Sequence, residues 1–367
     1  MKAIIRERIA KLREVMKKSG NEGILLSREE NIAYLTFGAR NHITFNTTEG
    51  VSSILITDEK TYLITNNIEM HRLFAEEIPE EIHDLFTKIE FNWWESEYEK
   101  VSGLVNIRNL LSDTGRYKTN DISADINAQR YILSRYEYDS LRALGKVIDE
   151  VFYERMPQLT PQMTEIEVQG LFFYEFLKRG FEPILVLVFG SESAQTYRHN
   201  LPRNVELKKS CFVSFCIRHR GLVISSTRSV QFEKNDRLIE QHLKNCRIDA
   251  KLIAASRPGV MMNRLFSVMA EAYAAEGFED EWRLHHQGGL AGYKSRELVC
   301  NPSLKYTIQT GNCVAWNPTL TGTKSEDTAI IHADTNEIVS CPENSQWPVL
   351  TFEIDGMTVR RPDIVAL

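Results

Sequence analysis

Residues 284–297 gather the side chains best suited to chemistry. Within fourteen residues they place the adjacent histidines His285 and His286, three glycines, Tyr293 and a final Arg-Glu pair. Imidazoles titrate or coordinate metal ions near neutral pH, and glycines let a backbone approach a ligand or a neighbouring strand closely. The segment therefore predicts a functional site, at which Tyr293 is a candidate substrate contact. The alternative is a tightly packed structural turn with one solvated histidine.

Helices and strands must position this segment. In the N-terminal third, residues 4–19 carry apolar side chains at helical spacing, and residues 23–26, 51–56 and 61–64 have the pattern of strands, with a hairpin turn at 57–60. Helical patterns follow at 137–152 and at 164–178, and the capping residues Thr164 and Glu167 open the second. The first part of the chain is therefore predicted to be α/β.

After Gly180 strands predominate. They are expected at residues 184–189, 211–217, 221–230, 313–317 and 329–333, with helices at 237–254 and 261–276. The whole chain is thus expected to be an α/β (α+β) protein.

Length and composition limit the class of protein. The 367 residues exceed the usual size of one domain, so two domains are expected. No apolar run approaches the roughly 20 residues of a membrane span, and the first residues alternate charged with apolar side chains, unlike a signal peptide. We expect a cytoplasmic protein that does not enter a membrane. The net charge of −6 argues against nucleic-acid binding, which favours a basic surface.

Six cysteines are spread over the second half of the chain without a Cys-x-x-Cys pair. This spacing gives no support to a zinc ribbon or a thioredoxin-type site and fits a reducing compartment. Most of the thiols are expected to be buried as small apolar side chains.

Five motifs occur in the order found in the creatinase, aminopeptidase P and prolidase family, which the chain resembles over nearly its whole length. They are Phe189-Gly190 with Arg198-His199-Asn200-Leu201-Pro202, then Ser226-Thr227-Arg228, then His286-Gln287-Gly288-Gly289-Leu290, then Asn317-Pro318, then the Gly-Thr-Lys-Ser-Glu-Asp-Thr sequence of residues 322–328. The resemblance implies the pita-bread fold. It places a creatinase-like N-terminal domain at residues 1–133 and a pita-bread catalytic domain at residues 134–367.

Peptidases of that family bind two divalent metal ions through two Asp, one His and two Glu, and this chain departs from that set. By the resemblance, the five positions fall at Ser214, Ser225, His286, Asn317 and Glu326. Only His286 and Glu326 keep a ligand-type side chain, and two ligands cannot balance the charge of two divalent ions. We therefore expect neither a metal ion nor another cofactor.

Creatinase, by resemblance, implies a metal-independent chemistry, because it hydrolyses a carbon–nitrogen bond with a histidine as general base. His199 matches the family's active-site histidine, and Glu326 matches a glutamate that orients a histidine or binds a cationic group. His286 is expected as a second proton donor or substrate ligand. His285 is a weaker candidate for substrate binding, because adjacent residues point to opposite sides of a strand. Arg228 could clamp a substrate carboxylate.

In creatinase-like dimers the N-terminal domain of one subunit covers the cleft of the other. The resemblance therefore implies a homodimer in which Arg40 and His42, within residues 38–45, contribute substrate contacts. On an ordinary surface loop both side chains would instead be solvated.

Three functions remain open at this point. The favoured one is a metal-independent hydrolase of a carbon–nitrogen bond in a small molecule or short peptide, with His199 as base and with Glu326 and His286 positioning the substrate. The first alternative is a metallopeptidase similar to Xaa-Pro aminopeptidases and dipeptidases, with an atypical site for Mn, Zn or Co. The second is a non-catalytic protein that binds a peptide or ligand, and fold alone does not separate the three.

Overall fold

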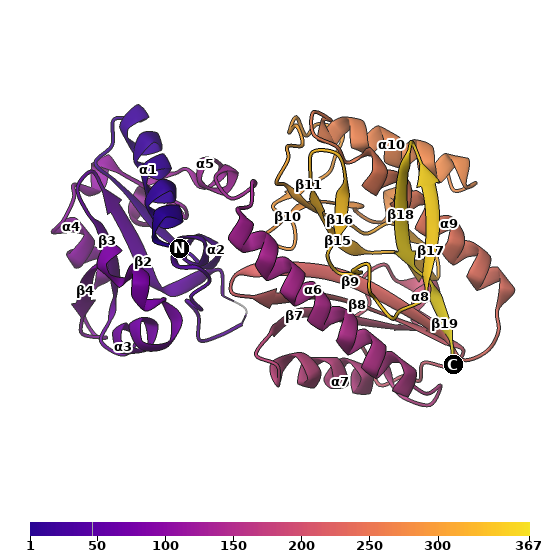
Figure 1. The fold of residues 1–367 in the computed structure, drawn as a ribbon. Helices are drawn as coiled ribbons and strands as arrows, with labels where there is room; N and C mark the ends of the chain where they lie inside the picture. Colours follow the sequence, from indigo (N-terminus) through magenta and orange to yellow (C-terminus); the bar gives the residue numbers. More distant parts are fainter. Residues whose placement is uncertain (46) are drawn as a thin grey trace. The chain divides into compact units, whose positions relative to one another are not determined.

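The computed structural model describes residues 1–45 and 47–367, which divide into two compact units, Met1–Arg130 and Tyr131–Leu367 (Figure 1). Each unit combines helices with a sheet of its own, as the α/β pattern of the sequence predicts.

The first unit is built on a six-stranded mixed sheet of order β4-β3-β2-β1-β5-β6. Neighbours β1, β2 and β3 are antiparallel, whereas β1–β5, β3–β4 and β5–β6 are parallel. The strands are β1 (Gly23–Arg28), β2 (Glu49–Thr57), β3 (Thr61–Asn66), β4 (Thr87–Phe91), β5 (Leu110–Ser112) and β6 (Asn120–Asp121). The helices are α1 (Lys2–Lys18), α2 (Glu29–Thr36), α3 (Met70–Arg72), α4 (Glu97–Ser102) and α5 (Ser123–Ala128).

The expected elements of this unit are confirmed. Helix α1 buries Ile5, Ile9, Leu12 and Met16, which recur three or four residues apart and so form one stripe. The three expected strands are β1, β2 and β3, and the backbone N–H of Thr57 closes the predicted turn by donating to the Lys60 carbonyl at 2.9 Å.

The second unit contains a four-stranded sheet of order β19-β9-β8-β7, a five-stranded sheet of order β11-β10-β12-β15-β16, and two ribbons, β13-β14 and β17-β18. The strands of the first sheet are β7 (Glu182–Gly190), β8 (Ser210–His219), β9 (Leu222–Gln231) and β19 (Ile364–Ala366). Those of the second are β10 (Gly288–Ala291), β11 (Leu298–Val299), β12 (Cys313–Trp316), β15 (Asp327–Ile331) and β16 (Asn336–Ile338). The ribbons are β13 (Thr319–Leu320), β14 (Thr323–Lys324), β17 (Val349–Ile354) and β18 (Met357–Pro362).

Helices cover these sheets. Helix α6 (Arg135–Arg155) packs on β9 and α7 (Glu165–Leu177) on β7, while α9 (Asp236–Ala255) packs on β17, β18 and its neighbour α10 (Met262–Ala275); α8 (Ser193–Thr196) is a short turn (Figure 1). Thr164 and Glu167 form the predicted capping box at the start of α7. Every residue of β9 is buried. Side chains on both faces of this strand are therefore enclosed by protein.

All six cysteines lie in the second unit, and each is a buried, free thiol. Burial raises the pKa of Cys246, Cys300 and Cys313 to about 12. The expectation that most of the cysteines are buried is confirmed, and their thiols are poor nucleophiles where they stand.

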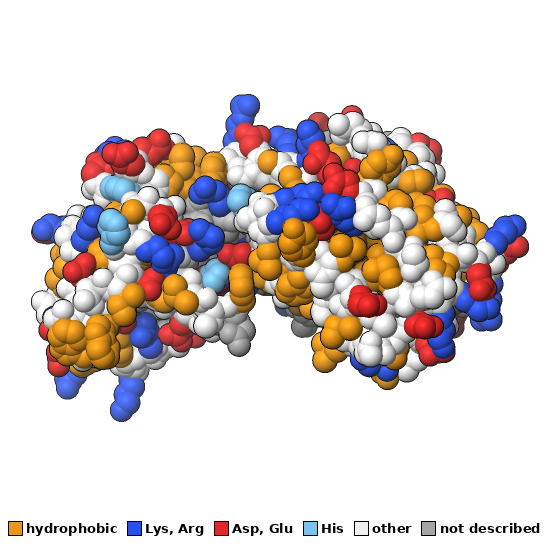
Figure 2. Space-filling model, turned by 90° about the horizontal axis from the view of Figure 1, so that it is seen from below, with side chains coloured by type: hydrophobic (Ala, Val, Ile, Leu, Met, Phe, Trp, Pro, Cys, Tyr) orange, Lys and Arg blue, Asp and Glu red, His pale blue; other side chains and the backbone are white. Residues whose placement is uncertain are grey.

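On the face shown in Figure 2, Lys and Arg side chains lie intermingled with Asp and Glu side chains. Among the described residues, no helix is both long enough and apolar enough to cross a membrane.

Candidate active site

Glu326 lies between β14 and β15 and is almost fully enclosed, with 3% of its surface exposed. Its position is fixed by β9, because the Thr227 backbone N–H donates to the Glu326 carbonyl at 3.0 Å. The hydroxyls of Ser214 on β8 and Thr227 on β9, which face each other across the two strands, donate to its Oε2 at 2.8 and 2.9 Å. The carboxylate, which precedes β15 of the five-stranded sheet, is thus held by β8 and β9 of the four-stranded sheet.

Two cationic side chains complete the surroundings of Glu326. Lys324 Nζ lies 3.0 Å from Glu326 Oε2 and donates to Ser214 Oγ at 2.8 Å. The Arg296 guanidinium donates to Glu326 Oε1 at 3.0 Å and to Ser225 Oγ at 3.0 Å. Burial by itself would raise the pKa of Glu326, but Lys324 and Arg296 outweigh it and hold that pKa at about 2. The carboxylate is therefore ionised, and both of its oxygens are already bonded.

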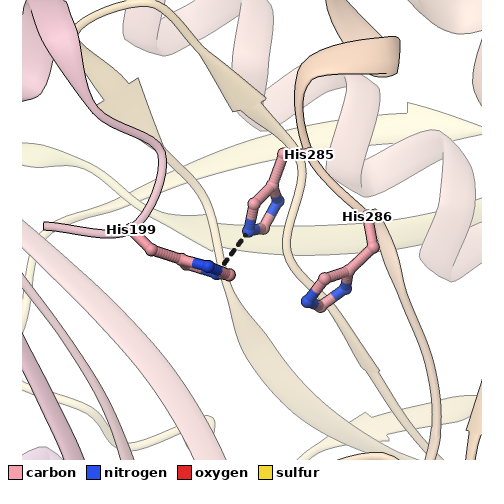
Figure 3. Close-up of side chains that lie close together, drawn as sticks. All are labelled: His199, His285 and His286. Atoms are coloured by element: carbon pink, nitrogen blue, oxygen red, sulfur yellow. Dashed lines mark hydrogen bonds between the residues drawn. The ribbon is translucent and has the colours of Figure 1, made fainter.

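Three histidines converge nearby. His199 follows α8, and His285 and His286 precede β10, yet the three imidazoles point toward one another (Figure 3). The Nε2 atoms of His199 and His285 are 2.9 Å apart, a hydrogen-bond distance, and one ring atom from each histidine lies within 4.8 Å of the others. His285 is buried, whereas His199 and His286 are exposed. The cluster is therefore closed on the side of His285 and open to solvent on the side of His199 and His286.

The structure corrects the expectation that His285 and His286 face opposite ways. Their rings stack, with centroids 4.6 Å apart. Both residues lie before Gly288, the first residue of β10, so the alternation of a paired strand does not apply to them. His285 is consequently part of the cluster.

Gly288 and Gly289 explain how this segment is held. Their φ angles are +104° and +155°, and a Cβ on Gly288 would lie 2.1 Å from the Ala315 carbonyl oxygen of β12. A Cβ on Gly289 would lie 2.1 Å from the Leu298 carbonyl oxygen of β11. Only glycine permits this close approach of three strands. The glycines predicted from the sequence therefore fix the strand that follows the two histidines.

All three imidazoles are held in the neutral form at neutral pH. Burial, followed by the charge of Lys324, lowers the pKa of His199 and lowers that of His285 much further. Burial, followed by Arg296, lowers the pKa of His286 to about 4. Each ring can therefore offer a lone pair to a proton or a ligand, in a field to which Lys324 and Arg296 contribute positive charge.

Arg228 and Tyr293 are both buried and hydrogen-bonded within the protein. The Arg228 guanidinium is fully buried and donates to Asp327 Oδ1 at 3.0 Å, on the face of β9 opposite to Thr227. The Tyr293 hydroxyl is buried and donates to Glu137 of α6 at 2.8 Å. Both polar groups thus have partners within the protein, and the expected role of the two residues as substrate contacts stays a prediction.

Arg40 and His42 are likewise bonded within their own unit. The Arg40 guanidinium donates to the buried Glu77 at 2.7 and 2.9 Å, and His42 Nδ1 is bonded to Glu29. His42 is buried, so the alternative of a solvated loop residue does not hold for it. A contribution of either residue to a partner's cleft stays a prediction, as does the homodimer.

The positions that correspond to the family's metal ligands do not fit a pair of divalent ions. Ser214 and Ser225 offer neutral hydroxyls, Asn317 offers an amide, and Lys324 and Arg296 already balance the Glu326 charge. Two divalent ions placed there would meet cations instead of the carboxylates they require. Asn317 Oδ1 is buried and has no hydrogen-bond partner among the described residues.

Sequence reasoning missed Lys324 and Arg296 as partners of Glu326. Arg296 is bonded to Glu326, thirty residues away, and that distance gave no sign of the pair in the sequence. Lys324 precedes Glu326 by two residues, the spacing that puts side chains on one face of an extended chain. That spacing is the signal that could have found it.

Family models match both parts of the chain. The model for metallopeptidase family M24 matches residues 139–340, more than half of the sequence, and the creatinase/prolidase N-terminal domain model matches residues 8–143. No curated protein matches the sequence. The predicted pita-bread fold with a creatinase-like N-terminal domain is confirmed by these matches.

Solved structures share the fold at low sequence identity. A prolidase from Pyrococcus horikoshii is 18% identical, with 92% of this chain and 99% of that chain covered and a TM-score of 0.78. A Xaa-Pro dipeptidase from Bacillus anthracis is 17% identical, with 99% and 100% covered and a TM-score of 0.78. The N-terminal domain of a FACT complex subunit from chickpea is 8% identical, with 93% and 96% covered and a TM-score of 0.74.

Proposed function

The chain belongs to metallopeptidase family M24, and from that premise we propose that it hydrolyses a carbon–nitrogen bond without paired metal ions, with His199 as general base. The coarser prediction, a hydrolase of the prolidase and aminopeptidase P kind, agrees with the family match and the fold. The proposal of a reaction without paired metal ions rests on the two cations at the Glu326 carboxylate, the buried Lys324 and the partly buried Arg296.

His199 is suited to accept a proton. Its imidazole is exposed to solvent, and its lowered pKa keeps a ring nitrogen unprotonated near pH 7. The hydrogen bond to His285 orients the ring, as the partner of a catalytic histidine commonly does. His199 is therefore the general base, and His285 is a positioning residue.

The proposed step conserves atoms and charge. A water molecule gives a proton to a free ring nitrogen of His199 while its oxygen attacks the carbon of the carbon–nitrogen bond. When that bond breaks, its electron pair stays on the nitrogen, which takes the proton back from the His199 imidazolium. His286, exposed beside His199 with ring centroids 6.0 Å apart, is placed to bind the substrate.

The two cations contribute through their field. Lys324 and Arg296 carry one positive charge more than Glu326 neutralises, and they lower the pKa values of the imidazoles. A positive field fixed in the protein stabilises the negative charge that develops on oxygen during attack on a carbonyl or amidine carbon. The lost metal ions would have supplied charge of the same sign.

We expect metal-stripped protein to cleave at least one member of a panel of Xaa-Pro dipeptides, simple amides and creatine-like amidines. His199→Ala should lower the rate about a hundredfold to ten-thousandfold, because it removes the general base. Activity should also fall as the pH drops below the ordinary imidazole range, since the base must be neutral. His332→Ala, in the same unit but bonded to Glu337, is the matched control and should leave the rate unchanged.

Two results would contradict this proposal. Loss of activity with a chelator and recovery with Mn, Zn or Co would establish the metallopeptidase alternative. A folded protein that binds members of the panel with the same affinity after His199→Ala, and cleaves none of them, would establish the binding-protein alternative.

A further inference from the structure

We propose that His199, His285 and His286 form a site for one divalent transition-metal ion, with Zn²⁺ the ion that fits best. The site shares His286 with the ligand set expected from the family resemblance and none of the other four positions. It lies on the imidazole cluster and not at the Glu326 carboxylate. The inference goes beyond the proposed function, since it concerns binding of an ion and requires no turnover.

The distances suit a tetrahedral ion with three imidazole ligands. Zinc–nitrogen bonds of about 2.0–2.1 Å place two ligand nitrogens about 3.4 Å apart. The Nε2 atoms of His199 and His285 are 2.9 Å apart, and the ligand atoms of all three histidines lie within 4.8 Å of one another. The distance between the His199 and His285 nitrogens must lengthen slightly, and the longer distances within the cluster must shorten. Side-chain rotation of the exposed His199 and His286 allows both changes. In Figure 3 the three rings already face a common point.

His285 supplies a second and independent observation. The residue is 8% exposed, and its Nδ1 is buried and has no hydrogen-bond partner among the described residues. A buried ring nitrogen without a partner costs free energy, and such atoms often mark a ligand or ion. Because no hydrogen bond fixes the proton on Nδ1, the ring can present a lone pair at either nitrogen.

The open side of the cluster provides access and a fourth ligand position. His199 and His286 are exposed, so an ion can enter from solvent and keep a water molecule or another small ligand. Neutral imidazoles need not release a proton before they bind. Soft or borderline ions prefer imidazole nitrogen, whereas Mg²⁺ and Ca²⁺ prefer oxygen ligands. The site should therefore select Zn²⁺ and its neighbours over the abundant hard cations.

The nearby cations limit the affinity. Lys324 and Arg296 repel an added cation, and the single negative charge of Glu326 only partly offsets their two positive charges. We expect a dissociation constant on the order of 1 μM, weaker than a structural zinc site. Binding through Nε2 would break the hydrogen bond to His285 that orients His199, so the ion would act as a reversible inhibitor of the proposed hydrolysis.

The test is a titration of metal-stripped protein with Zn²⁺ in competition with a chromophoric chelator. Wild-type protein should bind one equivalent, and Co²⁺ should give the intense visible bands of a tetrahedral complex. His286→Ala and His199→Ala, both at exposed positions, should each weaken Zn²⁺ binding at least tenfold while circular dichroism confirms the fold. The control His332→Ala should bind as the wild type does.

The same titration separates this site from the degenerate ligand positions. Ser214→Ala removes the hydroxyl between Glu326 and Lys324 without changing any charge, so it should leave Zn²⁺ affinity unchanged. The inference is overturned if wild-type protein binds no Zn²⁺ at 100-fold above the expected dissociation constant, or if His286→Ala binds as tightly as wild type. It is also overturned if Ser214→Ala weakens binding and the histidine variants do not. None of these results depends on a substrate being found.

Discussion

Glu326 and Asp327 are consecutive residues, yet they serve two buried charge clusters of different character. Glu326 is bonded to Lys324 and Arg296 on the side of the imidazoles. Asp327 faces the other way and receives Arg228 at 3.0 Å and Arg361 at 2.8 Å. One step along an extended chain therefore moves from the candidate site to the framework that supports it.

The two clusters differ in charge balance. At Glu326 one carboxylate meets two cations, which leaves one positive charge in excess. At Asp327 two arginines meet three carboxylates, because Arg361 also pairs with Asp249 at 2.7 Å and Arg228 approaches Asp149 at 3.9 Å. Burial raises the pKa of Asp249 to about 7, so a proton offsets the excess negative charge there. The charges around Asp327 are thus compensated within the cluster. The candidate site keeps one excess positive charge, which can act on a ligand.

The largest loss of stability should come from disrupting the ion pairs of Asp327 with Arg228 and Arg361. Asp327→Asn leaves Arg228 and Arg361 without their shared carboxylate, and we expect the free energy of unfolding to fall by about 3–5 kcal/mol. Denaturant titration measures the change. Asp280→Asn, whose partner Arg283 is exposed, should cost less than about 1 kcal/mol. Equal losses in the two variants would show that the buried ion pairs of Asp327 stabilise the fold no more than an exposed pair does.

The second effect concerns pH and is opposite in sign for the two clusters. The pKa of Asp249 is raised in the folded protein from 3.8 to about 7, so its contribution to stability is full below about pH 4 and declines as the pH rises to about 7. The pKa of Glu326 is lowered from 4.5 to about 2, so its contribution is lost as the pH falls through that range.

Asp249→Asn should therefore weaken the decline of stability that accompanies a rise in pH toward neutrality. We expect the loss in the free energy of unfolding between about pH 5 and about pH 8 to be smaller in the variant than in the wild type. Denaturant titrations at the two pH values measure it. An unchanged slope would mean that Asp249 titrates normally and that the framework is not compensated by a proton.

The smallest effect on stability should come from the candidate site. Lys324→Met removes the surplus charge, while Arg296 and two hydroxyls still bind Glu326, so we expect a loss below about 2 kcal/mol. The pKa of His199 should rise, because Lys324 lowers it. An NMR titration of the imidazole resonances measures this shift. Lys305→Met, at an exposed position, should move neither quantity, and a His199 pKa unaffected by Lys324→Met would show that the surplus charge does not reach the cluster.

Local patterns in the sequence were sufficient for the elements and for the order of the motifs. The stripe of Ile5, Ile9, Leu12 and Met16 requires only helical spacing, and the capping box of α7 spans four residues. The glycines at the start of β10 were singled out for close approach, which their contacts with β11 and β12 explain. These features are set by residues near one another in the chain.

Partners distant in sequence were not predictable in this way. Arg228 and Asp327 are 99 residues apart, and Tyr293 and Glu137 are 156 apart, so neither side chain showed in the sequence that it was already committed. The cluster of His199 with His285 spans 86 residues and was hidden further by the assumption of strand alternation. A lone polar residue in a motif has a role only once its partner is known.

Because the six thiols are buried, their rate of chemical labelling reports local or global unfolding of the protein. All of them lie within Tyr131–Leu367 and none within Met1–Arg130. A thiol-alkylating reagent can react only when the second unit opens, so the labelling rate in the absence of denaturant records how often that unit unfolds, while the first unit remains silent. The chain thus allows the opening of one of its two units to be timed without adding a probe.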